Sequence, residues 1–215
     1  MAEEKRRHPF RRIRKAIPLM RVATPLLLAS DSPRRRELLA AAGFEFERMS
    51  PPVSEEFDID LTLRELTAFN AIRKGRSVAR LRPDAVVLAA DTLVGLDDEI
   101  IGKPADLDRA AKILRRLSGR VHEVCSAVFI CHLASSRSTS FHEISRVRFH
   151  RLNREKIDNY LAQVNPLDKA GAYAAQGGGA TIIARIEGSF SNVVGLPMEK
   201  TVAALAAFGI KRKPA

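Results

Sequence analysis

The order of apolar and polar segments along the chain predicts a domain in which strands and helices alternate. Short, continuous apolar runs are typical of buried strands, and apolar residues at intervals of three and four are typical of helices. Several expected strands follow one another without a helix between them, which favours a mixed sheet over a doubly wound parallel one. We expect strands at Leu26–Ala29, Glu45–Met49, Ala85–Val94, Glu99–Ile101, Val121–His132, Thr139–Phe149 and Thr181–Ile186, and helices at Pro33–Ala42, Leu63–Arg80, Leu107–Leu117, Arg154–Gln163 and Pro197–Phe208.

The turn between the first strand and the first helix carries a phosphate-binding pattern. Ser32 is a natural N-cap, and Pro33 suits the first helical position because its missing N–H would be unpaired there. The free N–H groups of a helix N-terminus favour an anion, and arginine matches phosphate oxygens with a planar fork. Three arginines follow the proline, at 34–36. We therefore expect a phosphate site here, with Ser32 contributing to it.

Length and composition indicate one globular domain. The chain has 215 residues, of which 46% are hydrophobic and 28% charged, and no apolar run approaches the length of a membrane span. No apolar region follows the basic N-terminus, so a secretory signal is not expected. The two cysteines, Cys125 and Cys131, fit no zinc or redox motif and are expected to be buried thiols. These features favour a cytoplasmic protein without membrane contact.

The net charge of +11 is concentrated at the two ends of the chain. Residues 1–21 hold eight Lys or Arg and two Glu, and 211–213 are Lys-Arg-Lys, so the remainder is nearly neutral. We therefore expect a basic extension at 1–24, one domain at 25–210 and a basic tail at 211–215. The ends are expected to be solvated and mobile, and nucleic-acid binding by the domain itself is not expected because it lacks an aromatic-interleaved basic stripe.

Three further polar features are candidates for chemistry. Asp91 interrupts an apolar strand, and a buried carboxylate needs a charged partner, a metal or a shifted pKa. The acidic segment 54–58 fits either a solvated loop or a metal-binding loop. Lys103, at the end of an expected hairpin, fits either a phosphate contact or an ordinary surface lysine. The residues alone do not decide between these alternatives.

Small residues and glycines dominate two later segments, 168–177 and 187–197, and allow a ligand to approach the backbone closely. Gln176 offers both a donor and an acceptor, which suits the edge of a nucleobase. The chain contains no Walker A loop, no G-x-G-x-x-G and no G-x-S-x-G elbow. The five histidines show no metal-ligand spacing and are expected to be ordinary strand or surface residues.

Taken in order, these segments resemble the Maf family of nucleoside triphosphate pyrophosphatases. The resemblance extends over about residues 26–208. It implies an α/β fold of the Maf/Ham1 (ITPase-like) type, an elongated mixed sheet flanked by helices with a nucleotide cleft. It also implies hydrolysis of a nucleoside triphosphate to the monophosphate and pyrophosphate with a divalent metal, Mg²⁺, Mn²⁺ or Co²⁺. The matching motifs are Ala29-Ser30-Asp31-Ser32-Pro33-Arg34-Arg35, Ala89-Ala90-Asp91-Thr92, Gly102-Lys103-Pro104, Asp168-Lys169-Ala170-Gly171-Ala172-Tyr173, Gln176-Gly177 and Gly188-Ser189-Phe190-Ser191-Asn192-Val193-Val194-Gly195-Leu196-Pro197.

The resemblance assigns catalysis and metal binding to acidic positions. Asp91 matches the family's proton acceptor and would also contribute to the metal site. Glu55 falls where the family places a metal-binding glutamate. Ser54 stands where an acidic residue is common, so the choice between Glu55 and Glu56 stays open.

The resemblance assigns substrate contacts to basic and polar positions. Arg35, Lys74 and Lys103 match phosphate-contacting residues. The three positions linked to base specificity hold Arg34, Thr92 and Gln176, which resembles the branch that cleaves dTTP and UTP, with modified pyrimidine triphosphates as further candidates.

Two questions stay open at this point. The alternative to an enzyme is a nucleotide- or nucleic-acid-binding regulator of cell division without significant catalysis, which would use the basic ends. The preferred nucleotide and metal are also open, and a homodimer is one expectation for the oligomeric state.

Overall fold

A computed structural model of the protein describes residues 24–57 and 60–213. Its strands form one seven-stranded sheet. The strands are β1 (Leu26–Ala29), β2 (Glu47–Arg48), β3 (Val86–Leu96), β4 (Glu99–Ile101), β5 (Val121–His132), β6 (Arg137–Phe149) and β7 (Ile183–Glu187). The helices are α1 (Pro33–Ala41), α2 (Leu63–Leu81), α3 (Leu107–Leu117), α4 (Arg154–Gln163), α5 (Phe190–Val194) and α6 (Met198–Ala207), with short 3₁₀ turns at Leu133–Ser135, Ala170–Ala172 and Gly177–Thr181.

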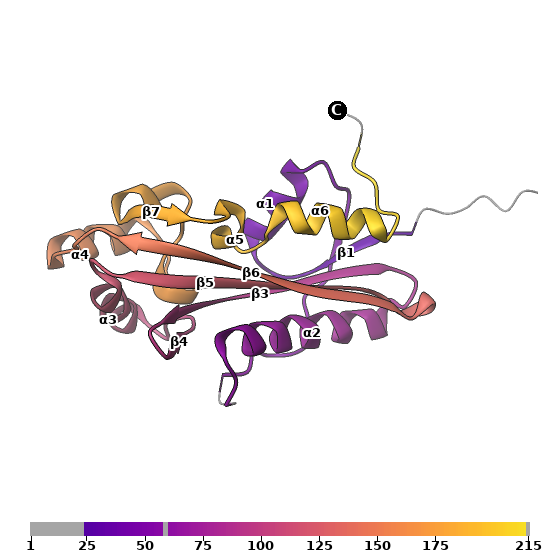
Figure 1. Cartoon of the computed structure of the whole chain (residues 1–215), viewed down its shortest axis with the longest axis horizontal. Coiled ribbons are helices and arrows are strands. Elements are labelled where there is room, and N and C mark those ends of the chain that lie inside the picture. Colours follow the sequence, from indigo (N-terminus) through magenta and orange to yellow (C-terminus); the bar gives the residue numbers. More distant parts are fainter. Residues whose placement is uncertain (1–23, 58–59, 214–215) are drawn as a thin grey trace, which may run out of the picture.

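The sheet is mixed, which confirms the expectation from the sequence. Its order is β2-β1-β3-β5-β6-β7, and β4 pairs with β3 outside this path. Strand β1 runs parallel to β2 and β3, whereas all other pairs are antiparallel. The long hairpin of β5 and β6 therefore forms the spine of an elongated molecule (Figure 1).

Helices cover both faces of this spine (Figure 1). At one end, α2 lies on one face while α1 and α6 lie on the opposite face. At the other end, α3 lies below the sheet in the view of Figure 1, α4 lies at the far left, and the strands β4 and β7 extend the sheet by pairing with β3 and β6. The buried residues form three clusters, one around α3 and α4, one beneath α1 and α6, and one beneath α2. The sheet is thus buried on both faces along much of its length.

Helix α2 approaches the sheet closely because of Gly75. A Cβ at this position would lie 2.4 Å from Cδ1 of Phe129 on β5, closer than real Cβ contacts allow. The helix begins with a capping box, in which Thr62 accepts from the amide of Glu65 and the Glu65 carboxylate accepts from the amide of Thr62. With its start and its contact surface fixed, α2 presents Lys74 to β3.

The expected elements are confirmed within two residues at each end. The expected strand at 45–49 is shortened to Glu47–Arg48, at the edge of the sheet. Helix α5, at 190–194, lies in a segment that the sequence suggested only as a glycine-rich loop. Ser32 does occupy the N-cap position, but its side chain makes no capping bond. Its backbone amide instead donates to Ser30 Oγ at 3.2 Å.

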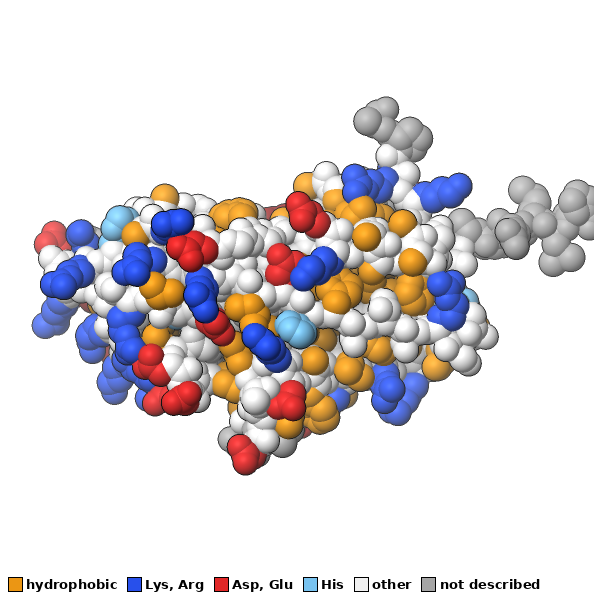
Figure 2. Space-filling view, in the orientation of Figure 1, with side chains coloured by type: hydrophobic (Ala, Val, Ile, Leu, Met, Phe, Trp, Pro, Cys, Tyr) orange, Lys and Arg blue, Asp and Glu red, His pale blue; other side chains and the backbone are white. Residues whose placement is uncertain are grey.

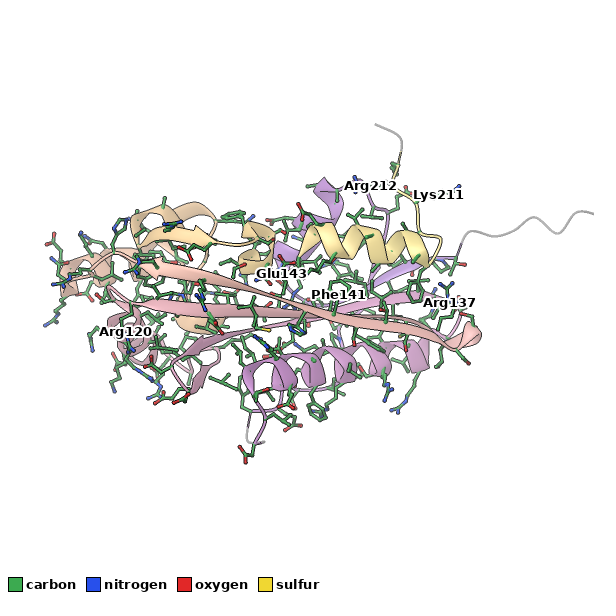
Figure 3. All side chains as sticks on the ribbon, in the orientation of Figure 1. Arg120, Arg137, Phe141, Glu143, Lys211 and Arg212 are labelled. Atoms are coloured by element: carbon green, nitrogen blue, oxygen red, sulfur yellow. The ribbon has the colours of Figure 1, made fainter. Side chains whose placement is uncertain are left out.

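The end of the described chain packs against the domain near α1. The amide of Lys213 donates to the Gly43 carbonyl at 2.8 Å, and its ammonium pairs with Glu45 at 2.5 Å. Lys211 and Arg212 are exposed beside α6 and α1 (Figure 3). The face seen in Figure 2 mixes acidic and basic side chains, so it does not present a uniformly basic surface. No helix among the described residues is long and apolar enough to cross a membrane.

Candidate active site

A cavity of about 410 Å³ lies where segments distant in sequence converge. The turn from β1 into α1 forms one wall, and β3 contributes Asp91, Thr92 and Val94. The opposite wall is the segment from 168 to 175, which precedes β7. Nearly all of the sequence-predicted site residues line this cavity: Ser32, Arg34, Arg35, Glu55, Lys74, Asp91, Thr92 and Lys103.

Two lysines and two carboxylates form a connected cluster in the cavity. Lys74 Nζ donates to Asp91 Oδ1 and to Glu55 Oε1, each at 2.6 Å. Lys103 Nζ donates to both carboxylate oxygens of Glu55 at 2.8 Å. Lys74 lies on the face of α2 that packs on the sheet, and Asp91 is the ionisable residue of β3 beneath it. The cluster therefore joins α2, β3, the 54–57 segment and the loop after β4.

Asp91 is the most deeply buried acid of this cluster, with 2% of its surface exposed. Its Oδ1 is paired with Lys74, whereas its buried Oδ2 has no hydrogen-bond partner among residues 24–57 and 60–213. Burial raises the pKa of the Asp91 carboxyl above its ordinary value, and the neighbouring Lys74 ammonium opposes that shift. A carboxylate with a free oxygen and a raised pKa is suited to accept a proton.

Glu55 has the opposite tendency. Burial acts to raise its pKa, but Lys74 and Lys103 outweigh burial and lower it to about 2. Glu55 is therefore a fixed anion at neutral pH. Its neighbour Glu56 pairs with Arg73, and its amide donates to Asn70, so it faces away from the lysine cluster. The geometry favours Glu55 over Glu56 for the role that the sequence left open.

The two leading arginines of α1 have different environments. The Arg34 guanidinium donates to Asp168, from Nη1 to Oδ2 at 2.8 Å and from Nη2 to the carbonyl oxygen at 3.2 Å. Arg35 is buried, and its Nε donates to the Gly195 carbonyl at 2.9 Å. Its Nη1 donates to Ser30 Oγ at 3.2 Å and its Nη2 to Thr92 Oγ1 at 3.0 Å. Burial lowers the pKa of the Arg35 guanidinium below its ordinary value, and the nearby Asp91 and Glu55 carboxylates oppose that shift.

An apolar wall completes the cavity beside this charged cluster. It is formed by Val94, Val124, Tyr173 and Val193, together with small alanines. The Tyr173 hydroxyl lies 2.8 Å from Nε2 of His122, a buried histidine whose Nδ1 has no hydrogen-bond partner. Burial lowers the pKa of His122 to about 4, so this imidazole is neutral near pH 7. A flat apolar wall beside a cationic cluster suits a ligand with an aromatic part and an anionic part.

One predicted site residue, Gln176, does not line the cavity, although Ala174 and Ala175 do. Arg36 is exposed, as expected for an arginine without an assigned role. Cys125 and Cys131 are buried free thiols, also as expected.

Sequence reasoning missed several contributors. Asp168 was part of a recognised motif but had no role, and in the structure it anchors Arg34. Ser126 and Asn192 were also without a role, yet they lie directly behind Thr92. A single polar residue within an apolar strand is the sequence pattern that predicts Asp91 as a site residue. The same pattern occurs at Ser126 in β5 and could have identified that residue too.

The carboxylates fit a hard divalent cation in their chemistry. Glu55 and Asp91 share Lys74 as a cationic partner, and the orphaned Oδ2 of Asp91 is an open oxygen ligand. No cluster of three or more metal-ligating side chains occurs among residues 24–57 and 60–213. Two carboxylates nevertheless suit Mg²⁺, which keeps several waters and takes further oxygens from a phosphate substrate.

In this mixed α/β fold, the lysine–carboxylate cluster and the turn from β1 into α1 line the same cavity. The sequence model of the family described as Maf-like protein matches residues 25–208. The chain therefore belongs to the Maf family.

Curated relatives agree with this assignment. A dTTP/UTP pyrophosphatase of Bacillus pumilus is 42% identical over 185 residues, covering 86% of this chain and 97% of the relative. One from Aquifex aeolicus is 46% identical over 178 residues, covering 81% of this chain and 90% of the relative. Among solved structures, the Staphylococcus aureus Ham1 protein covers 86% of this chain and all of its own, with 15% identity and a TM-score of 0.49.

Proposed function

We propose that the protein is a nucleoside triphosphate pyrophosphatase that hydrolyses dTTP and UTP to the monophosphate and pyrophosphate. The observation that carries this proposal is the Lys74-bridged pair of Asp91 and Glu55, placed among further cations in one cavity. The relatives at 42% and 46% identity are named for this activity. The choice of pyrimidine nucleotides is supported by those names and by the resemblance at Arg34, Thr92 and Gln176.

The reaction follows from the roles that these side chains can take. Arg35, Lys74 and Lys103 would bind the triphosphate, with Ser32 at the turn, because a polyphosphate needs several cations to offset its charge. The free oxygen of Asp91 would accept a proton from water as the water oxygen bonds to the α-phosphorus. The bond from that phosphorus to the oxygen bridging to the β-phosphate breaks, and pyrophosphate leaves with those electrons.

A divalent cation is part of the proposal. Glu55 and Asp91 would hold it, and when bound it would supply charge neutralisation and lower the pKa of a coordinated water. Lys74 and Lys103 pair with the same Glu55 carboxylate, so both ammonium groups lie where they would bind phosphate beside the cation. Which of Mg²⁺, Mn²⁺ and Co²⁺ serves best stays a prediction to be measured.

The proposed catalytic unit is residues 25–210. The family match spans 25–208, and every residue lining the cavity lies within it. We also propose a cytoplasmic location, in keeping with two free thiols. A homodimer stays a prediction.

The test is a pyrophosphate-release screen over canonical and modified triphosphates with each of the three metals. We expect turnover of dTTP and UTP, and we expect Asp91→Asn to lower kcat by about 10²- to 10⁴-fold, the usual contribution of a general base. Asp98→Asn, the same change at an exposed position of the β3–β4 turn, is the matched control and should retain activity. Full activity in Asp91→Asn would overturn the assigned role. A protein inert toward every triphosphate would favour a binding protein without catalysis.

A further inference from the structure

A chain of buried hydroxyls extends from Arg35 into the protein interior. Arg35 Nη2 donates to Thr92 Oγ1, and Thr92 Oγ1 lies 2.8 Å from Ser126 Oγ on the neighbouring strand β5. Ser126 Oγ in turn donates to the backbone carbonyl of Asn192 at 2.9 Å. Ser126 and Asn192 are both fully buried, so water does not compete for these bonds.

The direction of each bond in this chain is fixed by counting protons. A serine hydroxyl has a single hydrogen, and the Asn192 carbonyl can only accept. Ser126 therefore gives its hydrogen to Asn192. Thr92 Oγ1 lies 2.8 Å from Ser126 Oγ but 3.5 Å from the Gly195 carbonyl, which already accepts from Arg35, so Thr92 gives its own hydrogen to the nearer Ser126. Thr92 Oγ1 is then oriented with a lone pair toward Arg35. Ser126 thus determines that Thr92 acts as an acceptor for the guanidinium.

Asn192 holds the inner end of the chain rigidly. Its Oδ1 accepts from the Ser126 amide at 3.2 Å, and its Nδ2 donates to the Val124 carbonyl at 3.0 Å and to Ser145 Oγ at 2.9 Å. These bonds tie α5 to both β5 and β6. Gly195 directly follows α5, and its carbonyl accepts from Arg35 Nε. The segment of α5 therefore contacts Arg35 directly at Nε and acts on Nη2 only through Ser126 and Thr92.

The result is a guanidinium with a defined free edge. Three of the five Arg35 N–H groups are donated to Ser30, Thr92 and Gly195. Within the described part of the chain, this leaves one N–H on each terminal nitrogen for a ligand in the cavity. Two N–H groups on one planar fork match two oxygens of a phosphate.

We propose that Ser126, locked by Asn192, is a positioning residue that aims Arg35 at a substrate phosphate through Thr92. This inference rests on the proposed triphosphate hydrolysis, in which Arg35 contacts phosphate. It assigns Ser126 a role although its side chain lies behind the cavity wall and is absent from the lining. The role acts through a hydroxyl rather than through packing, so it can be separated from a contribution to stability.

The experiment is a double-mutant cycle between Ser126→Ala and Arg35→Lys, read as kcat/KM for UTP. With Arg35 present, Ser126→Ala should lower kcat/KM about tenfold, mainly through KM, the effect of losing one oriented hydrogen bond to a charged group. In the Arg35→Lys background there is no planar guanidinium to orient, so Ser126→Ala should change kcat/KM by less than about twofold. Equal losses in both backgrounds would mean a merely structural role and would overturn the proposal.

Variants at Thr92 and at a distant buried hydroxyl complete the design. Thr92→Val removes the hydroxyl through which Ser126 would act on Arg35, so it should reproduce the Ser126→Ala loss in KM. Thr67→Val removes a buried hydroxyl of α2 that donates to the Leu63 carbonyl of its own helix, and controls for lost stability. A KM for Ser126→Ala equal to that of Thr67→Val would contradict the proposal.

The outcome also separates this inference from the proposed function. If the wild-type protein hydrolyses UTP and Ser126→Ala behaves like wild type, the inference fails and the function stands. If the wild-type protein hydrolyses no triphosphate, the proposed function fails. Calorimetric binding of UTP to the four proteins of the double-mutant cycle (wild type, Ser126→Ala, Arg35→Lys and the double variant) then decides the positioning role. An oriented Arg35 predicts that Ser126→Ala weakens UTP binding only where Arg35 is present.

Discussion

Lys74 and Asp91 form an ion pair that water barely reaches. Their side chains are 8% and 2% exposed, and the pair is closed at 2.6 Å. Removing both charges from water is costly, and their attraction offsets that cost only while both partners are present. Glu55, held by Lys74 and Lys103, is the second anion that Lys74 satisfies. Lys74 is therefore important both for folding and for the arrangement of the two carboxylates.

Replacing Lys74 by Met tests this dependence. Lys74→Met leaves Asp91 buried without its partner and should lower the free energy of unfolding by about 3–5 kcal/mol at pH 7, measured by urea denaturation. Adding Asp91→Asn removes the stranded charge, so the double variant should be more stable than Lys74→Met alone. A double variant less stable than either single one would contradict a pairing role.

For individual residues, the sequence predicted that Asp91 needs a charged partner but did not predict which residue supplies it. A lone carboxylate in an apolar strand implies a cation or a metal, and Asp91 indeed has an ammonium beside it. That the ammonium belongs to Lys74 depends on how α2 packs across β3, which no local pattern specifies. The choice between Glu55 and Glu56 likewise depends on which of them a loop turns toward Lys103.

Helix α2 is the element that delivers Lys74, and Gly75 sets its distance from the sheet. In an isolated helix, glycine to alanine would stabilise by roughly 1 kcal/mol. Here the added methyl would meet the Phe129 ring at 2.4 Å and the Ala89 side chain at 3.3 Å. The cost of displacing α2 should exceed the gain in helix propensity.

Gly75→Ala should therefore destabilise the protein, by about 1–3 kcal/mol, the usual cost of overpacking a core. Thermal unfolding is the measurement. Arg76→Ala is the control, because Arg76 is the next residue of α2 and is exposed. Its free energy of unfolding should stay within about 0.5 kcal/mol of wild type. A higher melting temperature in Gly75→Ala would show that α2 does not pack as closely as described.

Long elements were predictable because their patterns are strong, and short ones were not. Helix α3 follows its N-cap Asp106, whose side chain accepts from the Arg109 amide, and its bounds agree with expectation. Helix α5 has only five residues, among them serine, asparagine and two valines, which are weak helix formers. It is held by tertiary bonds, chiefly those of Asn192, so its own sequence carries little signal.

For the whole molecule, the apolar wall of the cavity is continuous with the core around α3 and α4. Tyr173 lines the cavity and packs edge-on against His122 and Phe149, with ring centroids 5.4 and 4.8 Å away. His122 is 2% exposed, and its pKa is lowered from 6.5 to about 4 by burial. The folded protein therefore binds a proton at His122 less readily than the unfolded chain does.

Acid should weaken the whole fold through this histidine. The contribution of neutral, buried His122 to the free energy of unfolding is fully present above pH 6.5. It is lost as the pH falls toward 4, because the unfolded chain takes up the proton first. The loss amounts to roughly 3 kcal/mol. His122→Gln keeps a hydrogen-bonding group near Tyr173 but does not titrate, so the difference in unfolding free energy between it and wild type should narrow or reverse between pH 6.5 and 4. A pH-independent difference would contradict a neutral buried His122.

We expect the cavity to direct hydrolysis of a nucleoside triphosphate to the bond between the α- and β-phosphates. The most direct measurement is chromatographic separation of the products of UTP incubated with the full-length protein and Mg²⁺ or Mn²⁺. We predict UMP and pyrophosphate in equal amounts, without UDP. Accumulation of UDP and inorganic phosphate, or intact UTP with every metal, would contradict the account.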